Sequence, residues 1–254
     1  MTKKKTIDML ILIFAYLFCS SIPWNLFISG ELAYWLIPAF QLVMQLIYIV
    51  FWVFFIKKSS LDLVKIKANI KNLLLLSPVV FVFASNFLYA AFVPEDFSPH
   101  LDWTFALKIV LSFAVVVNEE VLFRYLLIGN LDLVKKPIWK IFVGAAIFGL
   151  CHISSFLSTF NPADLVVVLY TFGFGLILCF LYVYAGAPCT CICLHLLCNI
   201  VDGVVFDGLF YVSNYLTFIL VNVLIGLVYA LYIAIIYFVR LRKTTVYNVR
   251  GEAL

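Results

Sequence analysis

Long apolar runs recur along this chain, and they constrain its fold more than any other feature. A membrane-spanning helix needs about 20 apolar residues, and inside a bilayer only helices and closed barrels satisfy every backbone polar group. Of the 254 residues, 66% are hydrophobic and 12% are charged, whereas soluble domains carry about 25% charged residues. We therefore predict an all-α integral membrane protein, a bundle of about eight transmembrane helices. The predicted spans are residues 7–28, 32–56, 73–93, 103–128, 138–154, 165–184, 188–206 and 215–239.

The polar stretches between these runs are short, so none can form a separate soluble domain. We therefore predict a single membrane domain over residues 1–254. The first run begins after a basic start and could be mistaken for a signal peptide, but it is too long for a typical signal sequence. We expect it to be retained as the first helix.

The basic residues predict the orientation, because lysine and arginine accumulate in cytoplasmic loops. If eight helices cross the membrane, the even-numbered loops and both termini share one side. That side receives nearly all the basic residues, and we predict that it is the cytoplasm: Lys3, Lys4, Lys5, Lys57, Lys58, Lys65, Lys67, Lys71, Lys135, Lys136, Lys140, Arg240, Arg242, Lys243 and Arg250. The opposite loops hold only acidic charges: Glu31, Glu95, Asp96, Asp102 and Asp207. The formal net charge of +4 thus reflects topology, and we expect no nucleic-acid partner.

The fourth predicted span contains three ionisable side chains in the sequence NEEVLFR, residues 118–124. A charge near the middle of a bilayer costs roughly 3 kcal/mol on insertion scales. Ionisable residues inside a membrane are therefore functional candidates by default. The alternative is an ion pair that only joins two helices.

Three of the predicted helices each carry a pair of residues four positions apart, and such pairs share one face of a helix. These pairs are Glu120 and Arg124, Phe148 and His152, and His195 and Asn199. Glu119 and Glu120 point about 100° apart on their helix. Because Glu120 has the spacing to pair with Arg124, Glu119 is expected to face the bundle interior.

A helical rise of about 1.5 Å per residue puts Glu119, His152 and His195 at the middle or in the inner half of the membrane, where they can converge. A carboxylate beside two imidazoles is a plausible general base for a water nucleophile. The same three residues are candidate zinc ligands, since two histidines and a glutamate form one known catalytic zinc set. The sequence leaves open whether the cofactor is zinc or none. Asn199 can stabilise a developing oxyanion.

The three pairs, in this order, resemble the motif set of the CPBP family, which includes the CAAX prenyl endopeptidases and bacterial bacteriocin-processing and Abi-type membrane proteins. The CPBP-like core covers about residues 103–206. The resemblance implies an intramembrane endopeptidase in which Glu119 activates water together with His152. It also implies that His195 and Asn199 stabilise the oxyanion. Glu120, Arg124 and Phe148 would support these residues.

Two other classes of function stay open: a non-catalytic membrane scaffold or bacteriocin self-immunity protein of the same fold, and a proton-coupled transporter. A transporter is disfavoured because the sequence shows no obvious internal repeat and no matched pair of broken helices. The short loops indicate a multi-pass protein of the bacterial plasma membrane. We expect a membrane-associated peptide or protein as substrate, with a further membrane protein as an additional candidate partner.

Overall fold

The computed structural model describes most of the chain, namely residues 3–22, 24, 27–28, 30–61, 63, 66–99, 104–131, 134–153, 165–201, 210–212 and 215–246. Both predicted limits of the CPBP-like core, residues 103 and 206, lie outside these residues, as do Asp102 and Asp207. The first half of the chain forms α1 (Lys3–Ser20), α2 (Glu31–Lys58), α3 (Ile70–Leu76), α4 (Val79–Phe83), α5 (Ser85–Phe92), the 3₁₀ turn η2 (Pro94–Asp96) and the strand β1 (Phe97–Pro99).

The second half continues the helical pattern. It forms α6 (Phe105–Glu120), the π-helical segment η3 (Val121–Ile128), α7 (Pro137–Leu150), α9 (Leu165–Phe180), the π-helical segment η5 (Leu181–Ala185), α10 (Pro188–Ile200), the strand β2 (Phe210–Val212), α11 (Tyr215–Val239) and the 3₁₀ turn η7 (Leu241–Lys243). The predicted all-α class is confirmed apart from a short antiparallel pairing of β1 with β2, in which Ser98 lies opposite Tyr211.

Each predicted span contains helix in the structure, but the third is interrupted. Where one helix was expected over residues 73–93, α3 ends at Leu76, α4 begins at Val79, and α5 follows after Ala84. Pro78 explains the first interruption, because proline lacks the N–H that a continuous helix needs. By contrast, α2 continues through Pro38 without a break.

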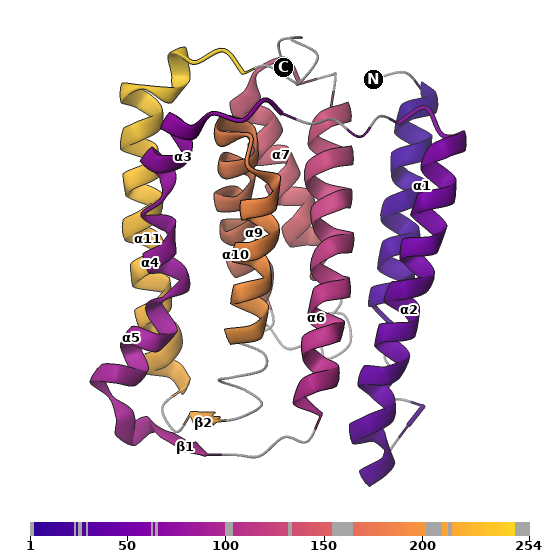
Figure 1. Cartoon of the computed structure of the whole chain (residues 1–254), viewed down its shortest axis with the longest axis vertical. Helices are drawn as coiled ribbons and strands as arrows, with labels where there is room; N and C mark the ends of the chain where they lie inside the picture. The colour runs from indigo at the N-terminus through magenta and orange to yellow at the C-terminus, as the bar shows by residue number, and fades with distance from the viewer. Residues whose placement is uncertain are drawn as a thin grey trace.

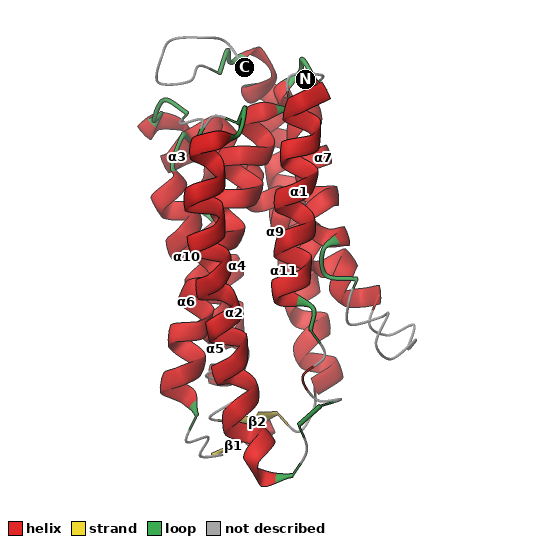
Figure 2. Ribbon diagram, turned by 90° about the vertical axis from the view of Figure 1, so that its right-hand side faces the viewer, coloured by secondary structure: helices red, strands yellow, loops and turns green. Residues whose placement is uncertain are grey.

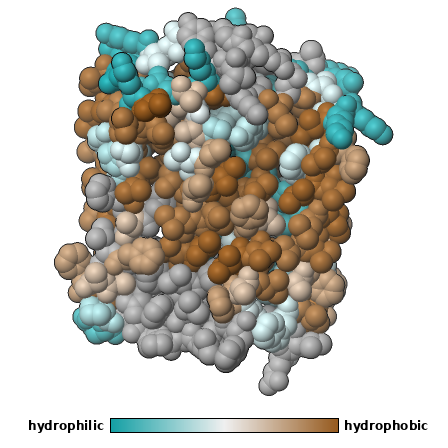
Figure 3. Space-filling model, viewed as in Figure 1, coloured by the Kyte–Doolittle hydropathy of each residue, from teal (hydrophilic) through white to brown (hydrophobic). Residues whose placement is uncertain are grey.

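The surface of the helices is apolar, as expected of a membrane protein. Two helical stretches are long and apolar enough to cross a bilayer, Trp35–Lys58 and Val168–Ala185, and further apolar helices in the described residues are shorter. Large hydrophobic side chains are widely exposed, for example Phe18 on α1, Phe54 on α2 and Leu231 on α11. Soluble monomers rarely expose such large apolar patches. Figure 3 shows these hydrophobic residues covering the middle of the molecule.

The helices run along a common axis, and the polar residues gather toward one end of the bundle (Figures 2 and 3). The first turn of α1 and the last turn of α11 lie at that same end, whereas β1 and β2 lie at the other (Figure 1). The basic ends of α2, with Lys57 and Lys58, and of η7, with Arg242 and Lys243, belong to the polar end.

One wall of the site is positioned by the close packing of α7 against α9. Glycines allow the two helices to approach this closely. A Cβ on Gly149 would come within 3.0 Å of Val168 O, and a Cβ on Gly175 would come within 2.9 Å of Phe148 Cδ1. Small residues of this kind let membrane helices approach each other. On the other side of the bundle, α6 packs between α2 and α10.

Between α2 and α3, the described residues 59–61, 63 and 66–69 are not helical, and they lie at the polar end of the bundle (Figure 1). They are held against the junction of η5 and α10. Asn69 N donates to Ala185 O at 2.8 Å, and Asn72 Nδ2 donates to Tyr184 O at 2.8 Å. Gly186 adopts the left-handed conformation there, with φ of 61°, and lies against the carbonyl of Lys67. These contacts fix the start of α10, the helix that carries His195.

Candidate active site

The two adjacent glutamates lie in the last turn of α6, where the α-helix changes into the π-helical segment η3. Glu119 is 3% exposed and Glu120 is 1% exposed. Single π turns inside helices occur frequently at functional sites. One turn later, Arg124 is completely buried. Its Nε lies 3.2 Å from Glu120 Oε2, so the ion pair expected from the spacing is present.

Glu120 also contacts a second helix, which the sequence did not predict. Its Oε1 lies 2.8 Å from Nδ1 of His195 on α10. One carboxylate therefore binds the Arg124 guanidinium with one oxygen and orients an imidazole with the other. A carboxylate that holds a histidine in this way fixes the orientation of its ring and favours a proton on Nδ1.

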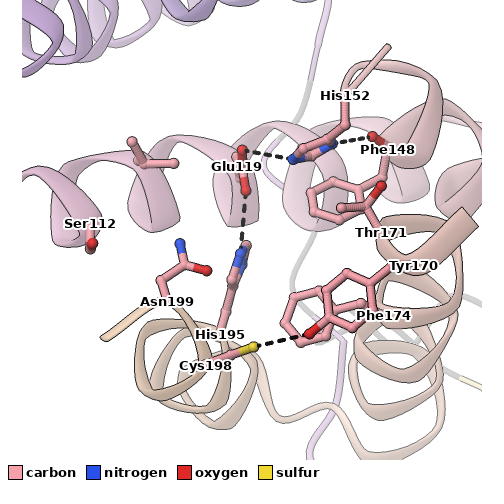
Figure 4. Close-up of a pocket in the computed structure, with 11 residues that line it drawn as sticks. Ser112, Glu119, Phe148, His152, Tyr170, Thr171, Phe174, His195, Cys198 and Asn199 are labelled. Atoms are coloured by element: carbon pink, nitrogen blue, oxygen red, sulfur yellow. Dashed lines mark hydrogen bonds and ion pairs between the residues drawn. The ribbon is translucent and has the colours of Figure 1, made fainter. Parts of the chain in front are cut away.

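Glu119 lies between the two histidines (Figure 4). Its Oε1 is 3.8 Å from Nε2 of His152, which follows the last residue of α7 by two positions, and its Oε2 is 3.4 Å from Nε2 of His195. The structure thus brings together the three residues that the sequence proposed to converge. His152 is the more accessible histidine, with 28% of its side chain exposed, compared with 4% for His195.

The hydrogen bonds of the two rings define which nitrogen faces the glutamate. His152 Nδ1 lies 2.9 Å from the carbonyl oxygen of Phe148. A carbonyl oxygen only accepts, so this nitrogen is the donor. His195 Nδ1 faces Glu120 in the same manner. Both rings therefore direct Nε2 toward Glu119. The 3.8 Å separation at His152 is too long for a direct hydrogen bond.

A cavity of about 360 Å³ adjoins these groups. Asn199 lines it together with the two histidines, so all four residues predicted to be catalytic meet at this cavity (Figure 4). Ser112 lies on the same face of α6 as Glu119, two turns earlier, and was not predicted. The complete lining is Ser112, Val115, Glu119, Phe148, His152, Tyr170, Thr171, Phe174, His195, Cys198 and Asn199.

Aromatic rings form the apolar side of the cavity. The Phe148 ring is buried with its centroid 4.6 Å from the guanidinium carbon of Arg124. It also packs edge-on against His152, with ring centroids 4.9 Å apart. The Phe174 ring packs against His195 at the same centroid distance. These rings keep both imidazoles in place and limit the access of water to the buried charges.

The zinc alternative concerns Glu119, His152 and His195. In the described part of the chain, no group of three or more histidine, cysteine, aspartate or glutamate side chains is placed so that it could hold a metal ion. No step below uses a metal ion.

Residues of the first two helices contact the charged stretch, and the sequence did not predict these contacts. The hydroxyl of Tyr16 on α1 donates a hydrogen bond to Glu119 Oε1. The neighbouring Asn118 receives a hydrogen bond from Trp52 Nε1 at 3.0 Å and donates to Gln45 Oε1 at 2.7 Å. A tyrosine or glutamine within an apolar run carries no motif, so only the fold identifies these contacts.

Comparison with known proteins supports the assignment that the motifs suggested. Residues 101–201 match the family model described as "Type II CAAX prenyl endopeptidase Rce1-like". No curated protein and no solved structure matches the chain. The matched segment contains the six motif residues and Glu119, and the buried carboxylates and histidines of the site lie within it. Over residues 101–201, this membrane protein is therefore similar in sequence to the Rce1-like CAAX protease family, in agreement with the CPBP resemblance of its motifs.

Proposed function

We propose that this protein is an intramembrane endopeptidase that hydrolyses a peptide bond of a membrane-associated peptide or protein. The observation that carries the proposal is the position of Glu119, whose two carboxylate oxygens face the Nε2 atoms of His152 and His195 at the wall of a cavity. The match of residues 101–201 to a protease family supports the same class of reaction.

In the proposed reaction, Glu119 acts as the general base. A water held between Glu119 and His152 Nε2 transfers a proton to the carboxylate while its oxygen attacks the scissile carbonyl carbon. The C–N bond then breaks as the tetrahedral intermediate collapses, and protonated Glu119 gives its proton to the leaving amine. Atoms and charge balance without a further reactant.

His195 and Asn199 are proposed to stabilise the oxyanion. Asn199 supplies an amide N–H at the cavity wall. When the His195 ring is protonated, both nitrogens are donors, so Nδ1 can remain on Glu120 while Nε2 donates toward the oxyanion. Preorganised donors of this kind are commonly the largest contribution to catalysis.

The proposed location is the bacterial plasma membrane, with about eight crossings and both termini in the cytoplasm. The apolar flanks of the helices and the gathering of polar residues at the end where α1 begins and α11 ends support this topology (Figures 1 and 3). The cavity adjoins buried residues of the helices. This position suits a substrate that reaches the enzyme from within or beside the bilayer.

Glu119→Gln tests the proposal. The amide keeps the shape of the side chain but cannot accept the proton, so we expect kcat to be abolished while the protein remains folded. In the native host, peptides from membranes with wild type, Glu119→Gln or no copy of the protein are compared by mass spectrometry. We expect one precursor to accumulate in both deficient strains and to be cleaved by purified wild type.

Substitutions of other site residues are expected to reduce kcat on that precursor to different extents. Asn199→Ala removes one oxyanion donor, and we expect it to lower kcat by about 10²–10³-fold, less than Glu119→Gln. Val115→Ala alters the apolar lining without a proton-transfer group and serves as the control. Undiminished cleavage by Glu119→Gln would overturn the protease proposal and favour the scaffold alternative.

Metal analysis tests the metal-free form of the reaction separately. We expect purified, active wild type to contain less than stoichiometric zinc and to keep its activity after dialysis against a chelator. His195→Ala is expected to leave the metal content unchanged. One zinc per protein that falls in His195→Ala would contradict a reaction carried by protein groups alone.

A further inference from the structure

We infer that Tyr16, on the first helix and outside the family-matched segment, is a positioning residue for Glu119. The inference rests on the proposed function, since it concerns the residue that the proposal makes the general base. Tyr16 is 3% exposed and its hydroxyl donates to Glu119 Oε1 across 103 positions of sequence.

The hydrogen bond from Tyr16 gives the Glu119 carboxylate a donor in place of the water that burial excludes. Glu119 is 3% exposed, so bulk water cannot provide the donors that a carboxylate needs, and a buried charge without donors is costly. Tyr16 provides an O–H on Oε1, whereas Oε2 faces His195 at 3.4 Å. With one oxygen held by the phenol, the carboxylate cannot rotate freely, and its two oxygens keep their separate directions toward the two histidines.

Contacts with α2 fix the position of Tyr16 along the axis of the bundle. The Tyr48 hydroxyl donates to the carbonyl of Leu12, one turn before Tyr16, at 3.1 Å. The rings of Tyr16 and Tyr48 pack edge-on, with centroids 5.4 Å apart. This contact sets the axial register of α1 against α2.

The same hairpin is joined to α6 at the residue next to the proposed base. Asn118 Nδ2 donates to both the backbone oxygen and the side-chain oxygen of Gln45, and Trp52 donates to Asn118 Oδ1. The α1–α2 hairpin therefore contacts α6 at two consecutive residues, 118 and 119. An active-site contribution from this hairpin accounts for these polar contacts beside the proposed base.

The test compares Tyr16→Phe with Tyr48→Phe. Each variant removes one buried hydroxyl from the hairpin and keeps the ring, but only Tyr16 donates to Glu119. We expect Tyr16→Phe to lower kcat about 10–100-fold, the loss that follows at metal sites when a partner that orients a ligand is removed. KM should stay unchanged, because Tyr16 does not line the cavity. Tyr48→Phe keeps the ring contact with Tyr16, so it should lower thermal stability in detergent and reduce kcat by less than Tyr16→Phe does.

A second pair of variants keeps the inference testable if Tyr16→Phe folds poorly. Para-aminophenylalanine and para-methylphenylalanine, introduced at position 16 by amber suppression, have similar volumes, but only the first carries an N–H donor. We expect the amino variant to retain most of kcat and the methyl variant to lose it. Equal kcat values for the pair would overturn the inference.

Glu119→Gln is measured on the same precursor in parallel. If Glu119→Gln is inactive while Tyr16→Phe keeps the kcat of wild type, Tyr16 has no positioning role and the protease proposal stands. If Glu119→Gln is active, the protease proposal itself fails. A fall in kcat for Tyr16→Phe that Tyr48→Phe matches would show a general effect of the hairpin and would also overturn the inference.

Discussion

Arg124 has no exposed surface, and its charge is balanced by the Glu120 carboxylate at 3.2 Å. Its Nη1 and Nη2 atoms have no hydrogen-bond partner among the described residues, and the ring of Phe148 lies against the guanidinium. The side chain is thus held by one ion pair and one aromatic face. Removing it leaves Glu120 buried without its cation.

We therefore expect Arg124→Ala to destabilise the protein by about 3–5 kcal/mol, the usual cost of breaking a buried pair from one side. Thermal unfolding in detergent and the yield of folded protein measure the effect, with the exposed Arg242→Ala as control. The double variant Glu120→Gln/Arg124→Met removes both charges and should recover part of the stability. It should not recover activity, because Glu120 also orients His195. Wild-type stability in Arg124→Ala would contradict this assignment.

At the scale of single residues, the sequence predicted the charged groups better than their partners. The i,i+4 spacing predicted the Glu120–Arg124 ion pair, and helix depth predicted that Glu119 and the two histidines could meet. The bond from Glu120 to His195 and the bond from Tyr16 to Glu119 join residues 75 and 103 positions apart. No local pattern encodes such contacts, because they depend on how helices are placed around α6.

At the scale of helices, the contact between α7 and α9 depends on Gly175. A Cβ at this position would come within 2.9 Å of Phe148 Cδ1 and 3.3 Å of the Ala145 backbone. Gly175→Ala must therefore displace the Phe148 ring, which separates Arg124 from the imidazoles. Gly173 lies two residues earlier on α9, and a Cβ there meets nothing within 4 Å.

We expect Gly175→Ala to lower thermal stability by about 1–3 kcal/mol, as overpacking does in other cores, and to reduce kcat. Gly173→Ala should be neutral or slightly stabilising, because alanine favours helix over glycine. Both are measured by thermal unfolding and by cleavage of the accumulated precursor. Equal behaviour of the two variants would show that the close approach at Gly175 has no consequence for the site.

Apolar runs predicted where the helices lie, but they did not predict how regular the helices are. The interruption at Pro78 had a visible signal in the sequence, because proline ends a helix unless tertiary packing allows the helix to continue through it. The π-helical segments η3 and η5 had no such signal. A π turn is set by packing around the helix, and the residues of η3 pack against α1 and α7.

At the scale of the whole molecule, the charge distribution predicts which end faces the cytoplasm. Reporter fusions after Asn69 and after the C-terminus should give a cytoplasmic signal, and fusions at Pro99 and Pro162 should give an outer-face signal. Asn69 caps the start of α3, which lies at the end of the bundle opposite to β1 (Figure 1). An outer-face signal from Asn69 would contradict the proposed orientation.

The long sequence separations in the site have a consequence for biogenesis. The ribosome makes chain at about 5–20 residues per second, so His195 is synthesised roughly 10–40 s after Tyr16. Once Glu119 and Glu120 are made, the nascent chain carries them without α10 until synthesis reaches that helix, and an interrupted product that stops before α10 never acquires the second imidazole. The proposed hydrolytic activity therefore requires translation to continue through α10, and a chain that stops earlier lacks His195 and Asn199, two of the four proposed catalytic residues.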